Sequence, residues 1–131
     1  MIVHIKGNPV PQKRHRHTRS GHTYDPSKKD KTPFITNLLL QKPEIPFSQP
    51  LMMRILISVE RPKSHYRTGK NKHKLKKGVQ EYPRGDCDNY AKFVMDCCER
   101  ANYFHNDSQV VALQVEKVYG EPFTEIYLGE A

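Results

Sequence analysis

The order of the predicted elements indicates an α+β fold, in which a small mixed β-sheet has two main helices packed on it. Segments of alternating apolar residues predict strands, and two longer segments with apolar residues at three- and four-residue steps predict helices. The last two predicted strands, at 110–118 and 123–128, are separated only by a turn with Gly120 and Pro122, which indicates a hairpin. A chain of 131 residues can bury one modest core, so we expect a single domain over residues 1–131.

Proline and glycine delimit the first strand and the first helix. Residues 2–7 alternate between apolar and polar side chains and end at Gly7-Asn8-Pro9, which predicts a short strand. Asp25-Pro26 predicts the start of a helix to about Gln41, because aspartate caps helices and proline fits the first helical position. Pro33 lies inside this span and should either kink the helix or mark its true start. The predicted buried side consists of Phe34, Leu38 and Leu39.

A strand and a long basic loop follow a proline-rich connector. Residues 51–59 have apolar side chains at every second position, which predicts a strand. From Arg61 to Lys77 the chain has eight Lys/Arg and no acidic residue. Charge repulsion and the scarcity of apolar residues predict a mobile basic loop over residues 61–84. This segment is either a disordered linker or, as we prefer, a loop that orders on nucleic acid.

The second helix has the clearest amphipathic pattern. Residues 88–101 place apolar side chains on one side and charged ones on the other. Residues 102–108 are rich in Asn, Asp and Ser and predict a turn before the strand at 110–118. The apolar side of the helix comprises Tyr90, Phe93, Val94, Cys97, Cys98 and Ala101. In the strand, we expect Val111, Leu113 and Val115 to share one face.

The two parts of the chain have opposite charge. Residues 1–85 carry 19 Lys/Arg and 5 Asp/Glu (19 − 5 = +14), whereas residues 86–131 carry 3 and 9 (3 − 9 = −6). A basic face predicts a polyanionic partner, because each phosphate that it neutralises releases condensed counterions. Nucleic acid fits better than a membrane surface, since no basic amphipathic helix accompanies the charge.

The expected location is the cytoplasm. No apolar run approaches the ~20 residues that a membrane span requires, and the N-terminus lacks the apolar core of a signal peptide. Cys87, Cys97 and Cys98 are odd in number and two of them are adjacent, so reduced thiols are expected.

Two basic segments are the candidate DNA-binding surfaces. In the first, around residues 9–24, Arg14, Arg16 and Thr18 would share one side of an extended chain, although a solvated loop is the alternative. The second is the basic loop at 61–84. The candidate DNA-binding residues are Lys13, Arg14, Arg16, Arg19, Arg67, Lys70, Lys72, Lys74, Lys76 and Lys77.

An acidic group around the second helix is the candidate metal site. Asp86 and Asp88 precede or open the helix, and Asp107 follows it, so the chain could fold the three carboxylates toward one point. Such carboxylates would repel one another without a cation, and Mg²⁺ prefers oxygen ligands of this kind. Lys92, one turn after Asp88, could orient a water or stabilise a phosphate. The alternative is structural: Asp88 caps the helix and pairs with Lys92, and Asp107 lies on the surface.

These residues also resemble a known family. Residues 85–111, with the pattern GDxDN, Lys92, Asp96 and the run NDSQVV, are similar to the RusA family of Holliday junction resolvases. The opening segment Gly7-Asn8-Pro9-Val10-Pro11, with its following basic residues and Tyr24-Asp25-Pro26, resembles that family's opening. The chain departs from the family pattern at Asn106, where many members have a second acid, and at His15, where a small residue or Gly often precedes Arg-Pro-Arg. It also lacks the proline of that motif.

The resemblance implies a homodimeric endonuclease that resolves four-way DNA junctions by paired symmetric nicks, in recombination, repair or phage DNA processing. It implies Mg²⁺ as cofactor, with Mn²⁺ as a possible substitute, in the cytoplasm of a bacterial or phage-infected cell. The catalytic residues carried over are Asp86, Asp88, Lys92 and Asp107, and the three aspartates are the metal ligands.

Two other functions share part of this evidence. A non-catalytic nucleic-acid-binding protein would explain the basic half but not the aspartates, and a nuclease for other branched DNA would need a different substrate geometry. A zinc module built from Cys87, Cys97, Cys98 and His105 lacks the paired cysteine spacing of such sites. A catalytic Cys–His pair has no support in the sequence around Cys87.

Overall fold

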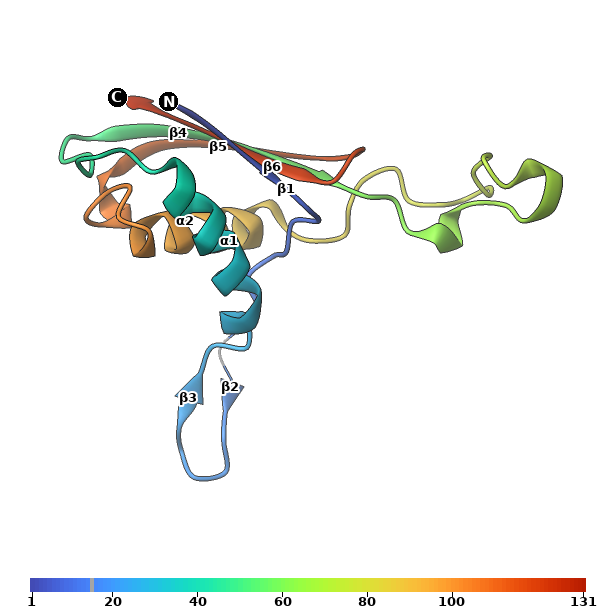
Figure 1. Ribbon diagram of the computed structural model, residues 1–131. Coiled ribbons are helices and arrows are strands. Elements are labelled where there is room, and N and C mark those ends of the chain that lie inside the picture. The colour runs from blue at the N-terminus through green and yellow to red at the C-terminus, as the bar shows by residue number, and fades with distance from the viewer. Residues whose placement is uncertain (15) are drawn as a thin grey trace.

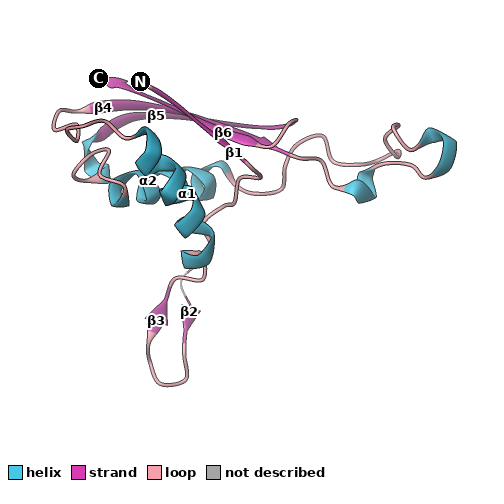
Figure 2. Cartoon of the chain, viewed as in Figure 1, coloured by secondary structure: helices cyan, strands magenta, loops and turns pink. Residues whose placement is uncertain are grey.

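A computed structural model describes residues 1–14 and 16–131, except for the side chains of residues 16 and 17. The elements run in the order β1 (Ile2–Lys6), β2 (Arg16–His17), β3 (Thr23–Tyr24), α1 (Lys28–Gln41), β4 (Leu51–Val59), α2 (Cys87–Arg100), β5 (Val110–Tyr119) and β6 (Phe123–Glu130). Three short 3₁₀ turns, η1 (Lys63–His65), η2 (Gly69–Asn71) and η3 (Asp107–Gln109), complete them. Figure 2 shows their distribution along the chain.

The main sheet is mixed, as predicted. Its strands lie in the order β1-β6-β4-β5, with β4 and β5 parallel and the other two pairs antiparallel. The predicted hairpin of the last two strands was wrong, because β4 lies between β5 and β6 in the sheet. The register aligns Val3, Ile126, Ile55 and Val115 across the sheet. Both α-helices lie on the same face of the sheet (Figure 1). This face is apolar, because the alternate strand residues that are buried there are mostly apolar.

The core forms between this face and α2. All six residues of the predicted apolar side of α2 are buried, so the amphipathic pattern predicted that helix correctly. α1 adds the fully buried Leu38, whose carbonyl accepts a 2.6 Å hydrogen bond from the Tyr103 hydroxyl. Phe34 packs edge-on against Phe93, with ring centroids 5.4 Å apart.

The start of α1 differs from the prediction. The helix begins at Lys28 after the N-cap residue Ser27, and it continues through Pro33 to Gln41. The Asp25 carboxylate instead accepts hydrogen bonds from the Ser27 N–H and from Lys31. The predicted start at Asp25-Pro26 was therefore wrong, because the polar side chain that resembles a cap takes part in a tertiary contact.

One predicted buried position, Leu39, is exposed, and so is part of the face expected for the strand at 110–118. Leu39 is 46% exposed because α1 contacts the core mainly through Leu38 and its neighbours one turn away. Val111 and Leu113 are also exposed, whereas Val115 packs against the core. β5 is an edge strand, and its residues 111–114 are exposed.

Two segments project from the domain in different directions (Figure 1). The first is the β2–β3 hairpin. The second is the basic arm (residues 61–84), whose nine Lys/Arg and one Glu give 9 − 1 = +8. The arm folds back on itself, with an antiparallel bridge between Tyr66 and Leu75 and a 2.8 Å hydrogen bond from Arg67 N to the Lys74 carbonyl. It therefore has local structure, and its mobility stays a prediction. None of the described helices has the length and apolar character that crossing a membrane requires.

Candidate active site

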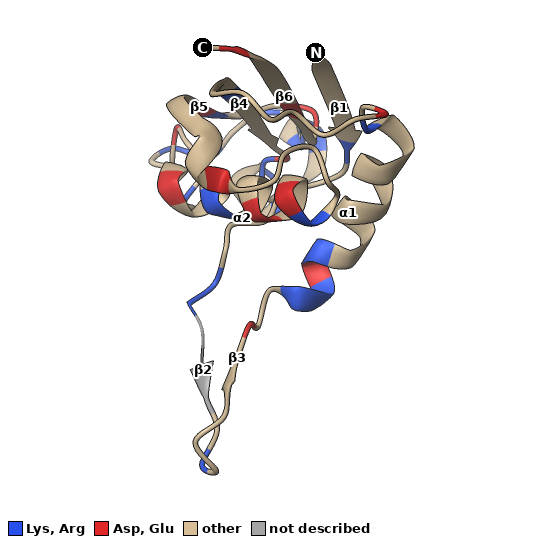
Figure 3. Cartoon of the chain, turned by 90° about the vertical axis from the view of Figure 1, so that its left-hand side faces the viewer, with Lys and Arg blue, Asp and Glu red and all other residues tan. Residues whose placement is uncertain are grey.

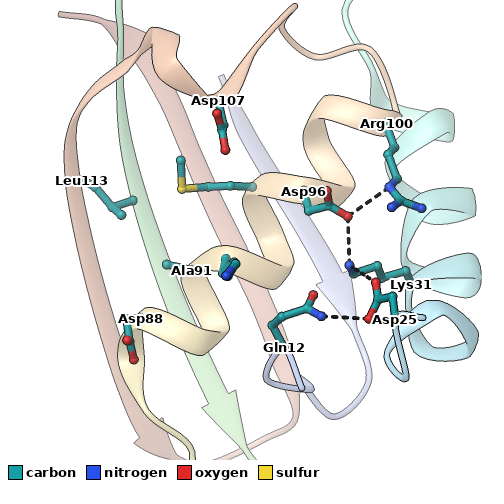
Figure 4. A pocket seen from close by; sticks show the side chains of 11 residues that line it. Gln12, Asp25, Lys31, Asp88, Ala91, Asp96, Arg100, Asp107 and Leu113 are labelled. Atoms are coloured by element: carbon teal, nitrogen blue, oxygen red, sulfur yellow. Dashed lines mark hydrogen bonds and ion pairs between the residues drawn. The ribbon is translucent and has the colours of Figure 1, made fainter. Parts of the chain in front are cut away.

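Three of the four predicted catalytic residues line one cavity of about 350 Å³. Asp88 and Lys92 lie one turn apart on α2, and Asp107 is the first residue of η3, which follows that helix. Leu113 of β5 and Met95 of α2 form apolar parts of the wall. Figure 4 shows Asp88 and Asp107 apart from the ion-paired residues on the other side of the cavity.

The turn that carries Asp107 is held by its neighbours. The Asn106 side chain accepts a 2.9 Å hydrogen bond from Ser108 N, and the Gln109 side-chain oxygen accepts one of 3.0 Å from Asn106 N. Gln109 Nε2 donates to the carbonyls of Phe47 and Gln49, which ties the turn to the segment before β4. The asparagine that stands where many members of the resembling family have a second acid is therefore the cap of this turn.

Asp86 lies outside the cavity walls. It is the exposed N-cap residue of α2, and its main-chain carbonyl accepts from Asn89 N and Tyr90 N, each at 3.1 Å. The structure does not support the alternative in which Asp88 caps the helix and pairs with Lys92. Asp86 rather than Asp88 occupies the cap position, and among the described side chains Asp88 and Lys92 form no ion pair.

The turn before Asp86 is anchored to β5. Lys117 Nζ donates to the carbonyls of Pro83 and Gly85 at 2.8 and 2.7 Å. Gly85 is required by close packing, since a Cβ there would lie 2.5 Å from the Tyr90 ring. Lys117 thus fixes the point at which the chain enters α2.

The structure does not assemble the predicted cluster of three carboxylates. Over the part of the chain that it describes, no three Asp, Glu, His or Cys residues are close enough to hold a metal ion together. The same observation leaves the zinc alternative without support. Cys97 is fully buried, and this burial raises the pKa of its thiol to about 12, as is typical of a core cysteine.

The cavity residues nevertheless fit a hydrated Mg²⁺ ion. The charged residues of the wall sum to 3 − 4 = −1. The Asp107 carboxylate has no hydrogen-bond partner among the described residues, and Asp88 accepts only from Asn89 N at 3.0 Å. Mg²⁺ needs one or two carboxylates, and its remaining ligands are waters and a substrate phosphate. Asp88 and Asp107 can supply the two carboxylates.

A buried ion-pair network on the other side of the cavity was missed by sequence reasoning. Lys31 Nζ lies 2.6 Å from Asp25 Oδ2 and 2.9 Å from Asp96 Oδ2, and its side chain is only 4% exposed. Arg100 Nε lies 3.0 Å from the same Asp96 oxygen. Burial alone would raise the pKa of Asp25, but hydrogen bonds from Lys31, Ser27 N and Gln12 outweigh it and lower the pKa to about 2. The network joins α1, α2 and the N-terminal loop at the cavity.

The candidate DNA-binding residues lie on both projections. Lys13 and Arg14 lie at the base of the hairpin and Arg19 lies near its tip, whereas the side chain of Arg16 and the whole of His15 are outside the described residues. The basic arm carries the other candidates, which are Arg67, Lys70, Lys72, Lys74, Lys76 and Lys77. In the cartoon of Figure 3, acidic positions are gathered along α2, and basic positions are found on α1 and at the hairpin tip.

Comparison with known proteins identifies the family. Residues 6–128, nearly the whole chain, match the family described as Endodeoxyribonuclease RusA. The chain belongs to the RusA family. It is also 35% identical to YqaN, an uncharacterized protein of Bacillus subtilis (strain 168), over 96% of this chain and 93% of that protein.

Family membership gives the cavity a chemical context. RusA proteins are endodeoxyribonucleases, and the match includes α2, η3 and the complete basic arm. The resemblance found in residues 85–111 is thus confirmed as membership.

Proposed function

We propose that this RusA-family protein is a Mg²⁺-dependent, structure-selective endonuclease that resolves four-way DNA junctions by paired symmetric nicks. The observation that carries the proposal is the common cavity of Asp88, Lys92 and Asp107 in a chain of an endodeoxyribonuclease family. In this proposal Asp88 and Asp107 bind the metal ion, and Asp86, at the entry of α2, contributes a further carboxylate when DNA is bound.

Phosphodiester hydrolysis is very slow without a catalyst, so charge on the reacting phosphate must be stabilised. A bound Mg²⁺ would supply positive charge to that phosphate, and Mn²⁺ would substitute for it. Lys92, on the same helical face as Asp88, would orient the attacking water or contact a phosphate oxygen. Leu113 and Met95 would limit the access of bulk water to one side of the cavity.

The hairpin and the basic arm would hold the DNA. Both carry candidate phosphate contacts, and they project from the domain in different directions, which suits a substrate with several arms (Figure 1). A homodimer would duplicate the cavity about a two-fold axis and so match the near-symmetry of a four-way junction. Cytoplasmic action on recombination or phage DNA follows from this proposal.

The test compares an immobile four-way junction with a linear duplex of the same sequence, in Mg²⁺ or EDTA. We expect symmetric nicks in the junction alone and only with Mg²⁺. Asp88→Asn should abolish cutting but keep or strengthen binding, because one carboxylate less reduces repulsion of the phosphates. Parallel loss of binding and cutting in Asp88→Asn would count against the assignment.

Two further outcomes would identify the alternatives. Equal cutting of flaps and three-way junctions would favour a nuclease for branched DNA in general. Binding without cutting, equal in wild type and Asp88→Asn, would indicate a non-catalytic DNA-binding protein.

A further inference from the structure

Gln12 is a buried residue of the cavity wall whose amide group is fixed in orientation. It is 9% exposed, and its Nε2 donates to the Lys13 carbonyl and to Asp25 Oδ1, each at 2.9 Å. Its main-chain N–H donates to the Asn89 carbonyl in the first turn of α2, also at 2.9 Å. A flip of the amide would place its oxygen against two acceptors, so the nitrogen must face Asp25.

The other end of the amide has no partner. Gln12 Oε1 is buried and accepts no hydrogen bond from any described residue. The residue lines the same cavity as Asp88, Lys92 and Asp107, and Figure 4 shows the oxygen on the side away from Asp25. Buried acceptors are normally paired with protein groups, water or an ion, so an unpaired one in a cavity wall indicates a ligand.

The oxygen atoms that line the cavity indicate which class of ligand it would bind. Carboxylate and amide oxygens are both hard ligands that suit Mg²⁺ or Mn²⁺, and a hydrated ion also presents strongly polarised water protons. An amide oxygen adds an acceptor without adding negative charge, so it does not increase repulsion of a DNA phosphate.

We propose that Gln12 Oε1 is a further oxygen contact of the hydrated divalent cation held by Asp88 and Asp107. The inference rests on the proposed function and extends it to the N-terminal loop. That loop leads into the β2–β3 hairpin, so cation binding would also fix the base of a DNA-binding segment.

The experiment measures Mn²⁺ binding to the DNA-free full-length protein by electron paramagnetic resonance and calorimetry. Gln12→Met keeps the length of the side chain and removes the oxygen, together with the Nε2 donor that binds Asp25 and the Lys13 carbonyl. We expect its Mn²⁺ dissociation constant to rise by about 10- to 100-fold, the usual effect of losing an outer contact of a metal site. Tyr103→Phe is the matched control, because it removes another buried hydrogen bond, to the Leu38 carbonyl, and leaves the cavity intact. Its Mn²⁺ affinity should equal that of the wild type.

If Gln12→Met does not fold, the wild type is tested by NMR, because Mn²⁺ broadens the signals of nearby groups. The Gln12 side-chain amide signal should disappear on addition of Mn²⁺, and its persistence at saturating Mn²⁺ would overturn the inference. A Gln12→Met affinity within about twofold of wild type would overturn it as well, and would leave the proposed function standing. Absence of Mn²⁺ binding in the wild type itself would instead overturn the proposed metal site, and the role of Gln12 with it.

Discussion

At the residue scale, Lys31 shows how strongly a side chain's role depends on its surroundings. Its ammonium group is buried between the carboxylates of Asp25 and Asp96. Lys31→Met would leave these carboxylates without their partner, and removal of one member of a buried ion pair costs about 3 to 5 kcal/mol. We expect a loss near the lower end, because Asp96 is 32% exposed and also pairs with Arg100. Urea unfolding at neutral pH measures the change in free energy.

The matched control is Lys13→Gln. Lys13 and Asp30 form an exposed ion pair at 3.8 Å, and such surface pairs contribute about 0 to 1 kcal/mol. Equal losses of unfolding free energy in the two variants would show that burial adds nothing to the Lys31 network.

The same network predicts a pH dependence of stability. The pKa of Asp25 is about 2 in the folded chain, and that of an unfolded aspartate is roughly 3.9. A lowered carboxyl pKa stabilises the fold fully above the unfolded value, and this stability is lost as the pH falls through the folded value. Lys31 acts in the opposite direction: its pKa is raised, so its contribution is present below the pKa of an unfolded lysine and is lost at higher pH.

We therefore expect the free energy of unfolding to decrease between about pH 4 and pH 2, and to do so less steeply in Asp25→Asn. Urea titrations at several pH values in this window test the expectation. The same slope in both proteins would mean that Asp25 does not contribute to the acid dependence.

Which residues line the cavity was only partly predictable from the sequence. Asp88, Lys92 and Asp107 were identified by type and spacing, and the structure brings them to one cavity. Gln12 and Lys31 were not identified, because their contacts join segments that are distant in sequence. A lysine among other lysines in the first turn of a helix resembles a solvated residue until the partner helix is known.

At the element scale, the basic arm folds back on itself although most of its charged residues are positive. Replacing Lys70, Lys72, Lys74, Lys76 and Lys77 by Gln should weaken junction binding and reduce its salt dependence. Each phosphate contact contributes about 0.9 to the slope of log K against log salt, so the slope should fall by up to about 4.5. Binding is measured in EDTA over a series of salt concentrations.

Lys42→Gln, an exposed charge just after α1, is the control and should leave the slope nearly unchanged. An unchanged slope in the arm variant would mean that the arm is a linker without phosphate contacts.

Local patterns predicted most elements but not how the arm or β5 is packed. The helix α2 and the strand β4 follow directly from apolar periodicity. The arm's base depends on contacts that no local pattern contains, since Arg61 lies 4.2 Å from the Tyr119 ring centroid and donates to the Gln80 carbonyl. The exposure of Val111 likewise follows from the edge position of β5, which only the strand order determines.

At the scale of the whole molecule, one face of the sheet is covered by helices and the other is not (Figure 1). The uncovered face includes Ile2, Arg54 and Tyr127, which lie side by side in the register. For the proposed homodimer, sedimentation equilibrium at micromolar concentration should give about twice the 15.3 kDa mass of one chain. A cruciform plasmid should then be converted directly to linear product, because two cavities cut during one encounter.

A monomer at every concentration, with nicked circles as the main product, would contradict the dimer.

The fold class was predicted correctly from the sequence, since the mixed sheet, the two helices and their common face agree with the prediction from element order. Strand order and subunit association involve contacts across the sheet and between chains, and apolar periodicity does not specify them.

The attachment of the arm has a mechanical consequence. On the outgoing leg, Arg61 and His65 contact Tyr119 of β5. Lys117 of the same strand binds Pro83 on the returning leg and Gly85 just after it, so both legs are fixed to β5. Because the arm is attached only at its base, bending would displace its tip most and its attached end least. In the proposed DNA complex, the distal lysines would follow the path of a DNA strand, while the entry to α2, with Asp86 and Asp88, would keep its position.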